Sequence, residues 1–489
     1  MKYILNLTWI AIFLLLTGCG KSFLELNNPA ALTYDKFYKT EADFQAALDG
    51  CYFRLKNQAP YILTFNESTT DNTFVHIESS TYQQYQFNIL AISSSSQFIQ
   101  NFWQDSYQAI AYANLVISRI GGSEVPEATQ KVFISEAKFL RALVYFNMVR
   151  VYGGVPLYAE EVTDLDAVYA TKRASVDEVY DFIISDLSDA VNIDNDRTEQ
   201  QRASAKNKAT SAAVKALLGK VYLYRHDYEK ALPLLTDVAE TSGYGLTSLE
   251  NLYNPDAESD NEVIFSINYE RVDGQSCTFA YNFLPKYSRG ILPNITSNDN
   301  GDGIYNLEDN TVNRFDRNDK RFTLLIDSLQ TLSGGELKKF YYTKKYLDLG
   351  SVPAGGGYNS ASDYIILRFA DVLLMCADAK NQLGDTPGAY PYINRVRERA
   401  GLENLSPNLS EEQMNDAIAA ERQKEFICEG DRWFDLNFRG FSYLQNMLNA
   451  FFPSSHRPSA NVKDHMVLFP IPADQINLKP GVLEQNNGY

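Results

Sequence analysis

The carboxylates whose spacing most suggests chemistry are Glu421, Glu425 and Glu429, which recur every four residues and so share one face of a helix. Two acids on either side of a sugar ring can hydrolyse a glycosidic bond, one as general acid and the other as base or nucleophile. However, Arg422 and Arg432 lie close in the sequence, and carboxylates beside arginines on a helix usually form ion pairs. We therefore expect this segment to be structural and predict no catalytic residue.

Other chemical motifs have little support. The histidines do not have H-E-x-x-H spacing, and the chain contains no C-x-x-C pair and no G-x-S-x-G nucleophile elbow. Residues 298–309 resemble a calcium loop with Gly303 at its turn, but Asn298 and Asp309 stand where such a loop requires a charged carboxylate and a bidentate Glu. We interpret the segment as a turn and predict neither a metal nor a cofactor.

Side chains suited to binding a sugar gather in two loop-rich regions, residues 59–97 and 242–363. Aromatic rings stack on the C–H-rich face of a pyranose, and amide and carboxylate groups hydrogen bond to its hydroxyls. No motif fixes the individual residues, and loop packing or contact with a partner protein is the alternative for each. The predicted ligand-binding residues are Asn66, Asp71, Tyr82, Tyr85, Tyr281 and Tyr287.

The N-terminal residues resemble a lipoprotein export signal. Lys2 precedes an apolar run over residues 3–16, which is shorter than the roughly 20 residues that cross a bilayer. The run ends in L-T-G-C, similar to the bacterial lipobox, in which the cysteine becomes acylated. We predict a signal peptide over residues 1–18, lipidation at Cys19 and a tether over 19–35. Ordinary secretion is the alternative.

The charge balance argues against nucleic acid as a partner. The 489 residues include 44 Lys and Arg against 61 Asp and Glu, a formal net charge of −17. A polyanion binder needs a concentrated basic surface, which this sequence does not provide. An anionic membrane would also repel the protein, so we expect acyl chains to provide the membrane attachment.

Much of the chain from Glu41 onward has helical periodicity. Residues 131–152 carry two apolar stripes, which predicts a helix packed on two sides, and Ser410 with Gln413 has the spacing of a capping box. Two segments show tetratricopeptide spacing, in which small residues stand where paired helices cross. These positions are Gly219, Ala231 and Leu235 and, in a weaker copy, Ala377, Ala389 and Ile393.

Residues 242–363 have a different texture, rich in Gly, Asn, Asp and Tyr. Val263, Phe265 and Ile267 alternate in a way that predicts a strand. Loops held by a rigid frame commonly carry recognition. The sequence therefore predicts a mostly α fold, a tetratricopeptide-like helical scaffold with an inserted loop-and-strand lobe that binds the ligand.

Some residues within apolar segments are expected to have structural roles. Arg141 and Arg368 lie in apolar segments, and we expect them to pair with buried acids. The cysteines after the lipobox are widely spaced, and no disulfide pairing is favoured over free buried thiols. They are Cys51, Cys277, Cys376 and Cys428.

Five groups of motifs follow one another along the chain. They are F-L-R-A at 139–142 with Y-G-G-V-P-L at 152–157, L-R-F-A-D-V-L-L at 367–374, N-R-V-R at 394–397, E-G-D-R-W-F-D-L at 429–436, and F-P-I-P at 469–472 with Q-N-N-G-Y at 485–489. Together they resemble the SusD/RagB family of Bacteroidetes outer-membrane lipoproteins. We accordingly place an N-terminal helical part at 36–241, the inserted lobe at 242–363 and a C-terminal part at 364–489.

The resemblance implies a binding protein without chemistry of its own, anchored by lipid in the outer membrane and exposed at the cell surface. Family members act as the lid of a SusC-type TonB-dependent β-barrel transporter and help load glycans or, in RagB-like members, peptides. The motifs do not specify which ligand is bound. The alternatives are a surface glycoside hydrolase and a repeat adaptor that binds only proteins.

Overall fold

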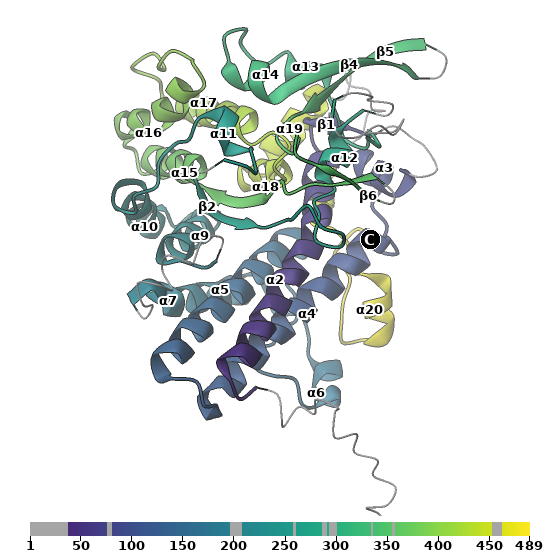
Figure 1. The fold of residues 1–489 in the computed structure, drawn as a ribbon, viewed down its shortest axis with the longest axis vertical. Coiled ribbons are helices and arrows are strands. Elements are labelled where there is room, and N and C mark those ends of the chain that lie inside the picture. Colours follow the sequence, from purple (N-terminus) through teal and green to yellow (C-terminus); the bar gives the residue numbers. More distant parts are fainter. Residues whose placement is uncertain are drawn as a thin grey trace, which may run out of the picture.

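The structure, a computed structural model, describes residues 38–75, 81–195, 208–257, 261–285, 291–292, 301–333, 336–354, 357–451 and 462–489. Helices make up most of this part of the chain (Figure 1). The longer helices are α2 (Glu41–Leu63), α4 (Gln97–Arg119), α5 (Glu127–Tyr152), α7 (Val176–Ala190), α9 (Ser211–Tyr224), α10 (Tyr228–Thr241), α15 (Phe369–Gln382), α16 (Thr386–Arg399), α17 (Glu411–Glu425) and α19 (Phe441–Phe451).

Short helices connect these elements. The α-helices are α3 (Tyr82–Asn88), α6 (Leu165–Ala170), α11 (Leu249–Leu252), α12 (Phe279–Phe283), α13 (Asp309–Val312), α14 (Lys320–Leu325), α18 (Arg432–Phe438) and α20 (Ala473–Leu478). The others are the π-helix η2 (Thr64–Ser68) and the 3-10 helices η3 (Ile120–Gly122), η4 (Ile193–Asn195) and η6 (Asp464–Val467).

The long helices pack one against the next into a continuous frame along the lower and left sides of Figure 1. α2 packs on α4, and α5 lies between α4 and α7, as its two apolar stripes predict. α7 then contacts α9, the hairpin partners α9 and α10 follow, and α10 packs against α15, which pairs with α16. The two hairpins with tetratricopeptide spacing are therefore neighbours in space although they are far apart in the sequence.

The crossing of α9 and α10 depends on the predicted small residue. A Cβ added at Gly219 would lie 2.7 Å from side-chain atoms of Leu235, which is closer than real Cβ contacts. In the weaker copy, Ala377, Ala389 and Ile393 are all fully buried. The tetratricopeptide-like packing predicted from the sequence is confirmed in both hairpins.

The strands form small sheets rather than a second large layer. One sheet has the order β1-β3-β5-β4, and β2 pairs with β8 and β6 with β7, all antiparallel. The predicted strand at Val263 is confirmed as β2, and the mostly helical fold class is confirmed as well. The strands are β1 (Thr73–Phe74), β2 (Val263–Ile267), β3 (Asn306–Leu307), β4 (Ile326–Ser333), β5 (Glu336–Thr343), β6 (Val352–Ala354), β7 (Gly357–Asn359) and β8 (Tyr364–Arg368).

The interior contains paired charges as well as apolar side chains. Arg141 forms two 2.7 Å bonds with the carboxylate of Asp186, and Arg368 pairs with Glu262 at 2.9 Å and with Glu429 at 2.8 Å. The predicted pairing of both arginines with buried acids is confirmed. The four cysteines after the lipobox are buried free thiols.

The predicted signal peptide, the acylated Cys19 and the tether lie outside the described residues. Within the described ranges, none of the helices combines the length and the apolar character needed to span a bilayer.

Candidate functional site

The structure brings the two predicted binding regions together on the upper right side of Figure 1, where α3, β1 and α12 are labelled. β1 pairs with β3, with Thr73 opposite Leu307. The backbone N–H of Glu308 donates to the carbonyl of Asn72 at 3.0 Å. The hydroxyls of Thr64 and Tyr305 lie 2.6 Å apart. Segments separated by more than two hundred residues in the sequence thus form one continuous support.

α3 presents aromatic and amide side chains on this support. Its sequence is Y-Q-Q-Y-Q-F-N, and the side chain of Tyr82 is 55% exposed, whereas Tyr85 is half-buried against the core. These two tyrosines are three residues apart and so share a side of the helix. Phe87 anchors the other side, with its ring 5.3 Å from that of Phe65, and the amide of Asn88 donates to the Ser68 carbonyl at 2.9 Å. The exposed side has the groups that bind sugars.

Tyr281 on α12 is half-buried, and its ring lies 6.2 Å from that of Tyr358. Its carbonyl accepts a 2.8 Å hydrogen bond from the backbone of Asp302, so α12 is bound to the chain segment that leads into β3. Tyr287, the remaining predicted tyrosine, lies outside the described residues.

Asn66 and Asp71 are completely buried beneath this face. The Asn66 amide donates to the Ile62 carbonyl at 2.9 Å and accepts from the Phe434 backbone at 3.2 Å. The Asp71 carboxylate accepts bonds from Arg432 at 2.8 Å and from other donors at the C-terminal end of the fold. We expect both residues to hold the face in place from below rather than to contact a ligand.

The segment that contains Asn66 and Asp71 was predicted to be a loop, but in the structure it is largely helical and buried. α2 continues through Pro60 to Leu63, and the chain then forms the π-helix η2. Residues 64–73 are fully buried, and most of their polar side chains find partners in the backbone of this segment or in the C-terminal part of the chain. A π-helix is uncommon and frequently occurs at functional sites.

Sequence reasoning missed Glu67 in this π-helix. Burial raises the pKa of Glu67 to about 7, although the Gly430 N–H donates to its carboxylate at 2.9 Å and Asn72 donates at 3.2 Å. Burial also favours the neutral form of Asp71, but there the charges of Arg432 and Arg314 outweigh burial and hold the pKa well below its usual range. The polar run N-E-S-T-T-D-N at residues 66–72 was the sequence feature that pointed to this segment. The sequence did not show that the run is buried.

Glu421 and Glu425 lie on α17, which ends at Glu425, so the expectation that Glu429 shares a helix face with them is wrong. All three carboxylates are engaged in ion pairs. Glu421 contacts Arg321 at 2.6 Å, and Glu425 contacts Arg368 at 2.6 Å. Burial alone would raise the pKa of Glu425, but the neighbouring arginines outweigh it and hold that pKa well below its usual range. A general acid needs a raised pKa, so these contacts support the structural interpretation.

The calcium-like segment is only partly described, since residues 298–300 lie outside the described ranges. Among the described residues, no group of three or more His, Cys, Asp or Glu side chains is arranged to hold a metal ion.

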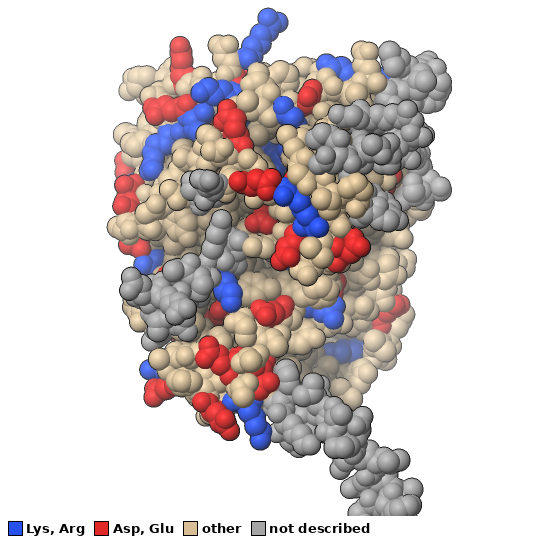
Figure 2. Space-filling view, in the orientation of Figure 1, with Lys and Arg blue, Asp and Glu red and all other residues tan. Residues whose placement is uncertain are grey.

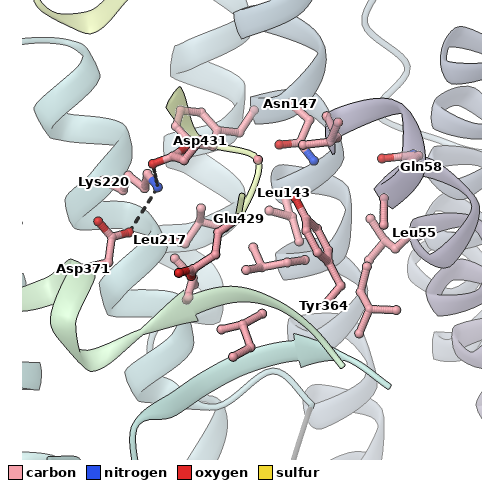
Figure 3. Close-up of a pocket in the computed structure, with 18 of the residues that line it drawn as sticks. Leu55, Gln58, Leu143, Asn147, Leu217, Lys220, Tyr364, Asp371, Glu429 and Asp431 are labelled. Atoms are coloured by element: carbon pink, nitrogen blue, oxygen red, sulfur yellow. Dashed lines mark hydrogen bonds and ion pairs between the residues drawn. The ribbon is translucent and has the colours of Figure 1, made fainter. Parts of the chain in front are cut away.

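Two concavities lie elsewhere in the described part of the molecule. The cavity in Figure 3, of about 60 Å³, lies beside Lys220, which contacts Asp371 at 3.1 Å and Asp431 at 3.0 Å. It is far smaller than the roughly 300 Å³ of a small ligand pocket. A groove of about 880 Å³ lies between α4, α6 and α20. Its lining combines aliphatic side chains, including Leu165 and Leu478, with aromatic and polar ones such as Trp103 and Gln104.

Comparisons with known proteins match both ends of the chain to related models. Residues 317–489 match a model described as the SusD family, and residues 22–223 match one described as starch-binding associating with outer membrane. Two SusD-like proteins of Formosa agariphila are 26% and 27% identical to the chain. The first alignment covers 96% of both proteins and the second 99% of both.

Solved structures share the fold. A laminarin binding SusD-like protein has a TM-score of 0.78 and 23% identity, with 92% of this chain and 100% of that chain covered. Surface glycan-binding protein A from Bacteroides thetaiotaomicron, solved in complex with laminarihexaose, has a TM-score of 0.76 and 19% identity over 92% of this chain and 100% of that chain. Together with the helical frame and the motifs along the sequence, these matches confirm the resemblance: the chain belongs to the SusD/RagB family.

Proposed function

We propose that this protein is a lipid-anchored, cell-surface glycan-binding protein of the outer membrane that acts as the lid of a SusC-type TonB-dependent importer. The observation that carries the binding role is the side of α3 with exposed Tyr82 and its neighbouring glutamines, in a chain that matches a starch-binding family model. Solved proteins of the same fold are named as surface glycan-binding proteins, and one is complexed with laminarihexaose.

The protein binds its ligand without cleaving it. SusD family proteins are non-catalytic glycan-binding proteins. The carboxylates with glycosidase-like spacing, Glu421, Glu425 and Glu429, are buried and engaged with arginines and a lysine. These three carboxylates therefore give no support for glycoside hydrolysis.

The anchor and the partner follow from the family. Acylation of Cys19 would hold the anionic protein at the outer membrane, as the family description associates its members with that membrane. In this role ligand binding is followed by closure of the lid over a β-barrel, and the transporter supplies the energy of uptake. The described surface in Figure 2 mixes acidic and basic side chains, and nucleic acid is not a proposed partner.

Calorimetric titration of residues 20–489 tests the binding role. The panel would include laminarin and starch oligosaccharides and, for RagB-like binding, peptides, with product analysis of each mixture. Tyr82→Ala should weaken glycan binding by roughly 1–3 kcal/mol, or about 5- to 150-fold, because a stacking ring is lost. Phe53→Ala is the matched control, since Phe53 on α2 is a 51% exposed aromatic residue that belongs neither to α3 nor to the groove lining.

Each other outcome has a distinct meaning. Unchanged affinity in both Tyr82→Ala and Tyr85→Ala would remove the α3 face as the site. Cleavage of an oligosaccharide would identify a hydrolase. Binding of peptides alone would place the protein with RagB-like members. If no ligand binds and no transporter co-purifies, the adaptor interpretation replaces the lid.

A further inference from the structure

The groove between α4, α6 and α20 exposes several apolar side chains at its rim. Its rim includes Leu165, Leu478, Tyr169 and Val162, whose exposed fractions are 69%, 56%, 47% and 45%. Single exposed apolar residues are ordinary, but a cluster around a concave surface commonly marks a docking site. Aromatic residues that include Trp103 form the more buried part of the lining.

The first described residue of the chain lies at the rim of this groove. The guanidinium of Arg119 is 5.3 Å from the centre of the Tyr38 ring, and that ring also contacts Phe44. Arg119 donates to Glu161 at 2.6 Å, and both residues line the groove. In Figure 1 the N-terminal end of α2 and α6 both lie at the lower end of the molecule. The chain before residue 38 therefore starts next to the groove.

The sequence before residue 38 does not have the composition of a linker. Residues 22–37 read S-F-L-E-L-N-N-P-A-A-L-T-Y-D-K-F, in which eight of sixteen are apolar or aromatic and none is Gly. Flexible linkers are rich in Gly and Ser, and disordered segments are poor in apolar residues. The match to the family model begins at residue 22, so this segment belongs to the family's common sequence.

We propose that residues 22–37 dock in the groove between α4, α6 and α20 and cover its apolar rim. Sixteen extended residues span about 50 Å, which is ample for a segment that starts at the rim. The apolar residues of the segment, among them Phe23, Leu24 and Leu26, match the apolar character of the rim at Leu165 and Leu478. The predicted tether over 19–35 then shrinks to the few residues after Cys19. A short tether would hold the folded protein close to the membrane in a fixed orientation. This consequence rests on the proposed lipid anchor, whereas the docking itself does not.

Limited proteolysis of residues 20–489 tests the docking. Trypsin cleaves after Lys36 and chymotrypsin after Phe23, and both sites should be protected while the segment is docked. In a Leu165→Asp, Leu478→Asp variant we expect cleavage at these sites to accelerate at least tenfold. Leu349→Asp is the matched control because Leu349 is 60% exposed and does not line the groove. It should leave the cleavage rates unchanged.

Hydrogen exchange provides the reciprocal measurement. A Leu24→Ser, Leu26→Ser variant should increase deuterium uptake in α6 and α20, with the uptake of α9 unchanged. Equal cleavage rates in the wild type and the groove variant, or unchanged uptake in α6 and α20, would overturn the proposal. Protection of the groove only after addition of a purified transporter would overturn it too and would assign the groove to that partner. Glycan affinity, measured in parallel, tests the proposed function separately.

Discussion

At the residue scale, two carboxylates four positions apart have opposite electrostatic surroundings. Glu67 and Asp71 are both fully buried in the polar segment beneath the candidate face. Asp71 has two arginines, Arg432 and Arg314, as direct partners. Glu67 instead accepts bonds from neutral donors, a backbone N–H and the amide of Asn72. Burial therefore dominates the pKa of Glu67, and paired charge dominates that of Asp71.

Glu67→Gln should remove a pH dependence of stability. Since the pKa of Glu67 is raised to about 7 in the folded state, the folded protein holds this proton more tightly than the unfolded chain. The resulting stabilisation is complete below the unfolded pKa of about 4.3 and is lost as the pH rises through about 7. The wild type should lose up to about 3 kcal/mol relative to the Gln variant across this window. Urea unfolding at pH 4.5, 6 and 8 measures the difference, and parallel curves would contradict it.

Asp71→Asn should destabilise the protein most near neutral pH, where Glu67 contributes least. The substitution leaves Arg432 buried without its closest counter-charge, which should cost about 3–5 kcal/mol near neutral pH. Because the pKa of Asp71 is lowered in the folded state, its contribution is present above the unfolded pKa of about 4 and is lost as the pH falls below it. The gap between variant and wild type should therefore narrow in acid, as followed by the same urea titrations. A gap that is constant from pH 7 to pH 3 would argue against an ionised Asp71.

At the element scale, the packing of α9 on α10 depends on the absence of a side chain at Gly219. Gly219→Ala gains about 1 kcal/mol in helix propensity but forces a Cβ to within 2.7 Å of Leu235. Overpacking of this kind costs about 1–3 kcal/mol, so we expect net destabilisation. Thermal unfolding of Gly219→Ala, Leu235→Ala and the double variant measures the coupling between the two positions. Because Leu235→Ala relieves the clash, the double variant should lose less stability than the sum of the losses of the two single variants. Gly121→Ala is the control, since no atom lies within 4 Å of a Cβ placed there.

At the scale of the whole molecule, buried ion pairs join segments from all parts of the chain. Arg368 contacts Glu262, Glu425 and Glu429, and Asp71 near the N-terminus pairs with Arg432 near the C-terminus. A buried network of this kind is poor evidence of high stability, but it is costly to break because one lost partner leaves charges unpaired.

Arg368→Met should therefore destabilise the protein by about 3–5 kcal/mol, because three buried glutamates lose a shared partner. Arg395→Met is the matched control: Arg395 is 39% exposed and lies 3.7 Å from Glu240, so its loss should cost less than about 1 kcal/mol. Denaturant unfolding of the two variants measures the contrast. If both variants lost the same small free energy of unfolding, the buried ion pairs would have rearranged to compensate for the missing Arg368, which contradicts the prediction.

Several features of the fold were predictable from the sequence because they depend on local spacing. The capping box of α17 is present, with the Ser410 hydroxyl accepting from the Gln413 backbone at 3.2 Å. Gly219 and Leu235 meet as the repeat spacing requires, and Arg141 finds a buried acid. These interactions are set by periodicities of a few residues, or by the high cost of burying an unpaired charge, and both can be recognised in a single chain.

The candidate site was only partly predictable, for a physical reason. Tyr82 and Asn66 both belong to polar, aromatic stretches of similar composition, yet one is exposed and the other is fully buried. Whether a polar side chain is buried depends on partners such as Phe434 and Arg432, which lie more than three hundred residues away in the sequence. The sequence by itself therefore determined the helices, their small-residue crossings and the family. Only the tertiary structure decided which polar residues face the solvent, because burial is a property of contacts between distant segments.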